Sequence, residues 1–315
     1  MNRRDLIKSA AALPFAARSM SAHSGSAPKM IKPKRLKKGD TVGIIAPASG
    51  ATPEAFDKAV ASMTTMGYKV KIGASARGRL GFLSAADAER LKDLHWAFSD
   101  PESNAVWCVR GGGGSPRLLE RIDYRLIKNN PKIFIGFSDI TALHIAISQA
   151  TGLVTFHGPV ASSEYSDFTR SNVLGVIAEP SAPFRVERSE FNNAKPSALY
   201  RGLEIVKGKA RGRLTGGNLS LLSSLAGTPF ALKGLKGKIL FIEEIEEPPY
   251  RIDRMLTQLR QSLDLRSLAG IALGIFDDKN AENAKDASPV MDVLRDRLGD
   301  LGIPVFYGLS FGHIR

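Results

Sequence analysis

A serine that could act as a nucleophile lies at a predicted strand-to-helix turn. In KIFIGFSDITALH, residues 132–144, an apolar run ends at Gly136, and Ser138 precedes a helical pattern. A sharp turn of this kind projects a side chain above the sheet and places the N–H of the next residue, Asp139, where an oxyanion would form. Serine and aspartate are also favoured as capping residues at helix starts, and GFSDIT lacks the closing glycine of GxSxG. Spacing alone therefore favours a cap and keeps the nucleophile as the alternative.

Four consecutive glycines lie between a predicted strand and a predicted helix in VRGGGGSPRLL, residues 109–119. Their spacing does not fit the GxGxxG dinucleotide fingerprint, because its last glycine would fall on Pro116 or Arg117, and no GK[ST] follows. Glycine reaches positive φ angles and lets a ligand approach the backbone closely. A helix N-terminus beside the run would add a favourable dipole for an anion. The run therefore predicts a cradle of backbone N–H groups for an oxyanion or a carboxylate.

Two histidines, His157 in TFHGP and His313 in SFGH, follow predicted strands, where a base could reach a serine. An ordinary structural role is the alternative for either one. Glu243 is expected at the C-terminal end of the strand ILFI, where a carboxylate could orient a histidine as a triad acid does. The next glutamates, Glu246 and Glu247, are expected in a solvated turn before a helix. No histidine and carboxylate pair has metal-ligand spacing, so no metal site is predicted.

The elements that would carry these residues alternate between short β-like runs and amphipathic helices from Lys37 to Gly158. This alternation predicts a parallel sheet covered on both faces, with chemistry at the loops that leave the C-terminal strand ends. Residues 166–200 are expected to form a linker or crossover. We therefore predict an α/β fold of two domains with the active site in the cleft between them. These are an N-terminal parallel-sheet domain of the Rossmann or flavodoxin-like kind over 34–165 and a smaller mixed α/β domain over 201–315.

The charge balance is strongly basic, with a formal net charge of +13 and a pI near 9.9. The basic residues are spread along the chain, with no dense run beyond Lys32–Lys38 and no interleaved aromatic residues, so nucleic acid is not the expected partner. An anionic substrate or an anionic cell surface fits the charge better. The single cysteine, Cys108, lies in the apolar run AVWCV and is expected to be buried. It excludes an internal disulfide and a CxxC motif.

Residues 1–27 are expected to lie outside the fold. They contain a twin arginine, Arg3 and Arg4, then a weakly apolar stretch and small residues, with cleavage expected after Ala22 or Ala27. This pattern resembles a twin-arginine export signal, and the alternative is a disordered basic N-terminus. The apolar stretch is shorter than the ~20 residues that a membrane-spanning helix needs. A periplasmic or otherwise exported protein without stable membrane insertion is therefore predicted.

Seven motifs in a fixed order resemble the LD-carboxypeptidase family of serine peptidases. They are IAPAS, RGGGGSPRLL, GFSDITAL, FHGP, TGGNLSLL with LAGTP, LFIEEIEEPPYRIDRML, and GLSFGH. Each is weak alone, but all seven in this order are specific, and they extend from about Lys37 to His313. The family includes muropeptide LD-carboxypeptidases and microcin C self-immunity hydrolases.

The resemblance implies a Ser-Glu-His triad and no cofactor. Residue by residue, Ser138 in GxSDxT would be the nucleophile, Glu243 after LFI the orienting acid, and His313 the base. Backbone N–H groups would form the oxyanion hole, from Asp139 and from Gly112 or Gly113. Resemblance thus reverses the preference at Ser138 from cap to nucleophile.

The implied reaction hydrolyses the amide between an L-configured centre and a C-terminal D-residue through an acyl-enzyme. In peptidoglycan tetrapeptides this is the bond from meso-diaminopimelate to D-alanine. The substrate is an anionic peptide, and the candidate residues for binding it are Arg117, Asn218 and Arg251. A hydrolase of peptidyl or aminoacyl nucleotide conjugates is the alternative within the family. A non-catalytic exported solute-binding protein is the alternative from another class, and the sequence leaves open whether the chain forms a homodimer.

Two departures from the family pattern concern the site. The family's glycine loop commonly reads GGYG, whereas Gly113 takes the aromatic position here. This change is expected to widen the substrate site. Family members also continue past the GH motif, so the C-terminal domain is expected to be truncated at its end.

Overall fold

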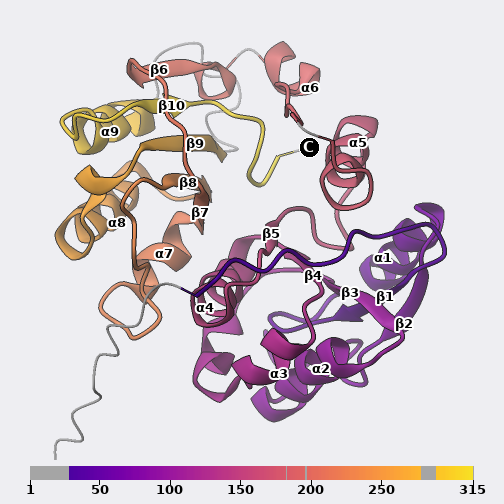
Figure 1. Ribbon diagram of the computed structural model, residues 1–315. Coiled ribbons are helices and arrows are strands. Elements are labelled where there is room, and N and C mark those ends of the chain that lie inside the picture. The colour runs from indigo at the N-terminus through magenta and orange to yellow at the C-terminus, as the bar shows by residue number, and fades with distance from the viewer. Residues whose placement is uncertain (1–27, 182, 196, 278–288, 315) are drawn as a thin grey trace, which may run out of the picture.

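The computed structural model describes residues 28–314, except for 182, 196 and 278–288, as two α/β domains that lie side by side (Figure 1). The export signal predicted over residues 1–27 falls outside the described residues. Within the described part of the chain, no helix combines the length and the apolarity needed to cross a membrane.

The N-terminal domain is built on a five-stranded sheet in the order β2-β1-β3-β4-β5, in which all neighbouring strands are parallel. Its strands are buried on both faces: Val106 and Cys108 of β3 belong to one apolar cluster, and Ala105 and Trp107 belong to another on the opposite face. This is the pattern of a parallel sheet with helices on each side. The strands are β1 (Thr41–Ile45), β2 (Lys69–Ile72), β3 (Ser103–Cys108), β4 (Ile133–Gly136) and β5 (Phe156–His157).

Helices cover both faces of this sheet. Apolar residues of α2, α3 and α4 share the cluster with Val106, whereas those of α1 and α5 share the cluster with Trp107. Helix α5 lies within the range predicted as a linker, and it belongs to this domain because Ile177 is buried there and accepts a hydrogen bond from the Leu36 N–H at 2.9 Å. The helices are α1 (Pro53–Thr65), α2 (Asp87–Ser99), α3 (Tyr124–Asn129), α4 (Thr141–Thr151) and α5 (Asp167–Ile177).

The C-terminal domain has a mixed five-stranded sheet in the order β6-β10-β9-β8-β7. Strand β6 is antiparallel to β10, and the other pairs are parallel. Its strands are β6 (Leu203–Val206), β7 (Leu214–Asn218), β8 (Ile239–Ile245), β9 (Gly270–Asp277) and β10 (Val305–Tyr307). Its main helices are α7 (Leu219–Leu225), α8 (Pro249–Ser262) and α9 (Pro289–Leu298), and the short helices α6 (Glu190–Ala194), η3 (Ala198–Tyr200) and η4 (Leu265–Ser267) complete this half of the chain. The two-domain α/β prediction is confirmed.

The helix predicted after the glycine run is present, in the tighter 3₁₀ form. The residues after the glycine run form the short 3₁₀ helix η1 (Ser115–Arg121) instead of an α-helix. The Arg117 N–H reaches back three residues, to the Gly114 carbonyl at 3.3 Å, as the tighter helix requires. Seven residues with a proline near the start offer few i→i−4 hydrogen bonds to favour the wider helix.

The two domains meet at the start of α4, three residues after Ser138. Helix α4 contacts both β7 and α7 of the second domain. The Thr141 hydroxyl accepts a hydrogen bond from the Asn218 backbone N–H at 3.0 Å. A Cβ on Gly217 would lie 2.5 Å from the Thr141 side chain, so only glycine allows this approach. The domain junction therefore adjoins the strand-to-helix turn that the sequence singled out.

Candidate active site

Ser138 has a left-handed backbone, with φ of 63°, which is uncommon for a residue other than glycine. It follows β4 and Phe137 and begins the one-turn 3₁₀ helix η2 (Ser138–Ile140) that leads into α4. The N-cap position of η2 is Phe137, and neither η2 nor α4 has a side-chain cap hydrogen bond. The capping interpretation of Ser138 is therefore wrong.

The glycine run packs directly against this turn. A Cβ on Gly111 would lie 2.9 Å from the Ser138 Cβ and 3.2 Å from its Oγ. Gly112 has φ of 102°, and a Cβ there would lie 2.3 Å from the Ser49 hydroxyl. That hydroxyl accepts a hydrogen bond from the Gly113 N–H at 3.0 Å, and the Ser49 N–H donates to the Gly111 carbonyl at 3.2 Å. Ser49 thus holds the loop against the serine turn.

A buried carboxylate ties the two loops together a second time. Asp139 accepts the Ser115 N–H at 2.8 Å through Oδ2, and its carbonyl accepts the Ser115 hydroxyl at 2.6 Å. Burial raises the pKa of the Asp139 carboxyl, against the lowering effect of these hydrogen bonds. The fully buried guanidinium of Arg90 donates to the carbonyls of Gly114, at 3.0 Å, and Pro47. The backbone around Ser138 is therefore fixed by several buried contacts.

Glu243 and His313 form a hydrogen-bonded pair in the second domain. Glu243 is the fifth residue of β8, its side chain is fully buried, and its Oε2 lies 2.7 Å from the His313 Nδ1. Burial alone would raise the pKa of Glu243, but the approach of His157 and the hydrogen bond to His313 lower it to about 2. Glu243 is therefore a carboxylate at neutral pH, and it orients the imidazole through Nδ1.

The segment after β10 places His313 by pairing with the end of β9. The N–H groups of Gly308 and Leu309 both donate to the Leu273 carbonyl at 3.1 Å. The Ile275 N–H then donates to the Phe311 carbonyl at 3.0 Å. In Figure 1 this C-terminal segment runs from β10 toward the N-terminal domain. Main-chain hydrogen bonds therefore fix the histidine, although it lies in no strand or helix.

The two halves of the site meet at Phe137, the residue before Ser138. Its ring lies 4.7 Å from the His313 ring, centroid to centroid. Gly136, one residue earlier, pairs with His157 in the sheet, and the His157 Nε2 lies 3.6 Å from the Glu243 Oε1. The structure thus brings the Ser138 turn, the glycine run, Glu243 and His313 to one place between the domains.

The three candidate substrate-binding residues already have protein partners. Arg117 is 56% exposed and pairs with Asp87 at 3.0 Å. Arg251 is 55% exposed and pairs with Glu247 at 3.1 Å. Asn218 is buried at the start of α7, where it accepts the Leu221 N–H at 3.3 Å and donates to Glu244 at 2.8 Å: its carboxamide connects β7, α7 and β8.

Sequence reasoning assigned no role to several residues that support the site. Ser49 lies in IAPAS, Thr141 in GFSDITAL, and Ser115 follows the glycines, so the motif positions were a usable signal. Glu244 is buried and accepts the Ser220 N–H at 2.8 Å and its hydroxyl at 2.7 Å. Burial raises the pKa of Glu244, in contrast to its neighbour in sequence. The two adjacent glutamates therefore have different roles. Glu243 faces His313, whereas Glu244 stabilises the start of α7.

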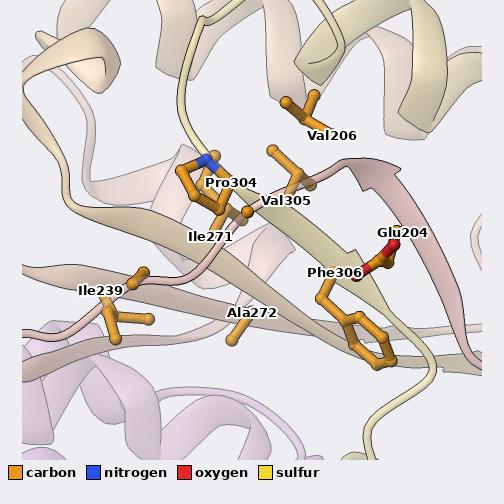
Figure 2. Close-up of a pocket in the computed structure, with 10 residues that line it drawn as sticks. Glu204, Val206, Ile239, Ile271, Ala272, Pro304, Val305 and Phe306 are labelled. Atoms are coloured by element: carbon orange, nitrogen blue, oxygen red, sulfur yellow. The ribbon is translucent and has the colours of Figure 1, made fainter.

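A hollow in the C-terminal domain is separate from this site. The hollow has a volume of about 150 Å³. Its lining is mainly apolar (Figure 2). It lies beside Ile239, the first residue of β8, and does not include Glu243 or His313. Within the described residues, no group of three or more histidine, cysteine, aspartate or glutamate side chains is arranged to hold a metal ion.

Both domains of the chain match a family of known proteins. Residues 42–158 match the LD-carboxypeptidase N-terminal domain, and residues 211–315 match the LD-carboxypeptidase C-terminal domain. A probable murein peptide carboxypeptidase of Bacillus subtilis is 42% identical over 287 residues, covering 90% of this chain and 86% of the relative. A murein tetrapeptide carboxypeptidase of Pseudomonas aeruginosa is 33% identical, covering 86% and 87%. The crystal structure of an MccF-like protein from Bacillus anthracis superposes with a TM-score of 0.79 at 31% identity, covering 90% and 91%. The chain therefore belongs to the LD-carboxypeptidase family, as its seven motifs indicate.

Proposed function

We propose that this protein is a serine-type LD-carboxypeptidase that removes the C-terminal D-alanine from peptidoglycan tetrapeptides. The observation that carries the proposal is the Glu243–His313 hydrogen bond of 2.7 Å beside the strained turn at Ser138. The names of the relatives from Bacillus subtilis and Pseudomonas aeruginosa support the substrate class.

The proposed triad divides its roles between the domains. Ser138 Oγ attacks the carbonyl carbon of the amide between meso-diaminopimelate and D-alanine, while the Nε2 of His313 takes the hydroxyl proton. The tetrahedral intermediate then breaks its C–N bond, and His313 returns the proton to the leaving amine. Water, activated by the same nitrogen, hydrolyses the acyl-enzyme and releases the tripeptide. Glu243 holds Nδ1–H and stabilises the imidazolium that forms twice in the cycle.

Backbone N–H groups would stabilise the oxyanion of each tetrahedral intermediate. The donors we propose are Asp139, the residue after Ser138, and Gly112, the neighbour of Gly111, which packs against Ser138. Gly113 was an equal candidate in the sequence, but its N–H donates to Ser49. A donor of this type contributes roughly 3 kcal/mol to the transition state in enzymes where it has been removed.

The backbone strain at Ser138 supports a nucleophile over a structural serine. A left-handed conformation at a residue with a Cβ costs on the order of 1–3 kcal/mol, and such strain concentrates at functional sites. A side chain at position 111 would collide with Ser138, so glycine is required there. Ser138 is therefore held in a backbone conformation that serine does not favour on its own.

Arg117 and Arg251 are proposed to bind carboxylates of the substrate. Each guanidinium is more than half exposed, so a substrate carboxylate could replace or join the present partner at little desolvation cost. Asn218 stays a prediction as a substrate contact, because its carboxamide is used within the protein.

The deciding experiment is mass spectrometry of tetrapeptide incubated with the protein from residue 28 onward, beside Ser138→Ala. Loss of one D-alanine with the wild type alone supports both the reaction and the nucleophile. An intact tetrapeptide in both samples would overturn the muropeptide proposal.

Hydrolysis of peptidyl or aminoacyl nucleotide conjugates is a second candidate, favoured by the structural likeness to the MccF-like protein. The same assay with an aminoacyl sulfamoyl adenosine separates the two candidate functions. The products of the conjugate differ in mass from the tripeptide and D-alanine that the tetrapeptide would give. A solute-binding protein would leave both compounds intact and bind one of them tightly.

A further inference from the structure

His157 belongs to the N-terminal domain, but its side chain points into the second. Strand β5 delivers it opposite Gly136 of β4, two residues before Ser138. Its ring lies 5.3 Å from that of Phe241 on β8 and 6.2 Å from that of Phe137. The side chain is 9% exposed, so these aromatic neighbours hold it away from solvent.

The two oxygens of Glu243 face two different histidines. Oε2 accepts a hydrogen bond from His313, and Oε1 lies 3.6 Å from the His157 Nε2. Among the described residues, neither Oε1 nor either ring nitrogen of His157 has a hydrogen-bond partner. Leaving one oxygen of a buried carboxylate unpaired is costly, and a shortening of about 0.5 Å would make this contact an N–H···O hydrogen bond. Within the described part of the chain, Oε1 and Nε2 are thus two buried, unpaired polar atoms that face each other.

His157 lies next to His144 of its own domain and Glu243 of the other. The centroid of the His144 ring lies 6.1 Å from that of His157. The His144 Nε2 lies 2.8 Å from the Gly136 carbonyl oxygen. Burial, with a smaller contribution from the neighbouring His157, lowers the pKa of His144 to about 3. His144 is therefore uncharged at neutral pH, whereas Glu243, with Oε1 3.6 Å from the His157 Nε2, is ionised.

We infer that His157 is a positioning residue whose Nε2–H binds the Glu243 Oε1 and so fixes the acid–base pair of the C-terminal domain against Ser138 of the N-terminal domain. The inference rests on the proposed triad. A carboxylate held at one oxygen can rotate about its side-chain bonds, whereas one held at both keeps its plane. The direction of the His313 Nδ1–H bond, and with it the position of the catalytic Nε2, follows from that plane.

His157→Gln and His157→Met form a matched pair for the test. The two side chains have nearly the same shape and volume, but only glutamine can donate an N–H to Oε1. We expect His157→Met to lower kcat for tetrapeptide about 10- to 100-fold with little change in KM, and His157→Gln to stay within about fivefold of the wild type. His95→Gln, a histidine substitution on the far helix α2, is the control.

A pH profile separates positioning from simple loss of packing. The hydrogen bond to Oε1 stabilises the ionised carboxylate, so its removal raises the pKa of the Glu243–His313 pair. The acid limb of kcat should then move to higher pH in His157→Met and stay in place in His157→Gln. Equal losses in both variants with an unmoved acid limb would show a purely structural role and overturn the inference.

A fluorophosphonate reagent makes the test independent of the substrate. The Ser138 Oγ forms the new P–O bond, fluoride leaves, and His313 accepts the hydroxyl proton, so the labelling rate measures nucleophile activation. If the wild type is labelled but does not cleave tetrapeptide, the proposed substrate fails, and the labelling rates of the two variants still decide the role of His157. If His157→Met is labelled as fast as the wild type, the inference is wrong; if Ser138 is not labelled at all, the inference falls with the triad.

Should His157→Met fail to fold, His157→Phe replaces it. Phenylalanine keeps a ring between Phe137 and Phe241 and has no donor. Circular dichroism verifies the fold of each variant before its rate is compared. Wild-type labelling by a folded His157→Phe would overturn the inference, and a loss of the expected size that His157→Gln does not share would support it.

Discussion

The His313 Nδ1 lies 2.7 Å from the Glu243 Oε2, and the same imidazole ring lies 4.7 Å from the ring of Phe137, the residue before Ser138. The histidine therefore has its acid partner in its own domain and its aromatic neighbour in the other. Relative displacement of the domains would change the distance from the histidine to the serine while leaving the Glu243 pair intact. The positions that control activity should thus include residues at the domain junction as well as the triad.

Replacing Glu243 with glutamine tests the acid. Glutamine keeps the shape of the side chain but has no charge to stabilise the imidazolium, and it can present an N–H where His313 needs an acceptor. By analogy with other triads, we expect kcat to fall about 10³- to 10⁴-fold. Steady-state kinetics on tetrapeptide measures this, with Glu89→Gln on the exposed face of α2 as the charge-matched control. Retention of more than a tenth of the wild-type kcat would exclude Glu243 from the triad.

The depressed pKa of Glu243 also predicts how stability depends on pH. The ordinary pKa of a glutamate carboxyl is 4.5, and that of Glu243 in the folded protein is about 2. A group whose pKa is lower in the folded protein stabilises it above the unfolded-state pKa, and that contribution is lost as pH falls through the folded-state pKa. The melting temperature of the wild type should therefore drop more between pH 4.5 and pH 2 than that of Glu243→Gln. Parallel curves for the two proteins, measured by scanning calorimetry, would contradict the assigned pKa.

A methyl group at Gly111 should disturb the nucleophile without unfolding the domain. Its Cβ would lie 2.9 Å from the Ser138 Cβ and 3.1 Å from the Phe137 carbonyl, so the serine turn has to shift. A displacement of about 1 Å at a reacting group costs roughly 100-fold in rate, which is the loss we expect in Gly111→Ala. Gly43→Ala in β1 is the matched control, because its Cβ would meet no atom closer than 3.4 Å. Equal activity of the two variants would show that the Gly111 contact is unimportant.

The proposal of export rests on residues 1–27 and has its own test. Replacing Arg3 and Arg4 together with lysine keeps the charge but removes the guanidinium pair that the twin-arginine receptor reads. We expect the substituted chain to stay in the cytoplasm while the wild type appears, shortened, in the periplasmic fraction of a Gram-negative host. Immunoblotting of the fractions measures this. Export of both chains to the same extent would contradict a twin-arginine signal.

The elements of the fold followed from local patterns, and several features of the site did not. Alternating runs predicted the parallel sheet because each strand and helix carries its own periodicity. They also placed Ser138 shortly after the end of β4 and Glu243 in the C-terminal half of β8. The contacts of Phe137 with His313 and of His157 with Glu243 depend on how the two domains dock, and no short pattern encodes that. The left-handed backbone of Ser138 was also not visible, since serine is common at ordinary helix starts. Recognition of the family through seven ordered motifs predicted that Ser138, Glu243 and His313 act together, which spacing alone did not.

The strain at Ser138 predicts that the side chain needed for activity makes this position less favourable for stability than glycine would be. Glycine adopts φ of 63° without a steric penalty, whereas alanine keeps the Cβ that makes the left-handed region unfavourable. Both Ser138→Gly and Ser138→Ala lack the nucleophile and should be inactive on tetrapeptide. Urea denaturation should nevertheless show Ser138→Gly to be more stable than Ser138→Ala by about 1 kcal/mol, despite the larger backbone entropy that glycine loses on folding. If alanine proved as stable as glycine, the turn would not be strained in solution, and the argument from strain to nucleophile would have to be abandoned.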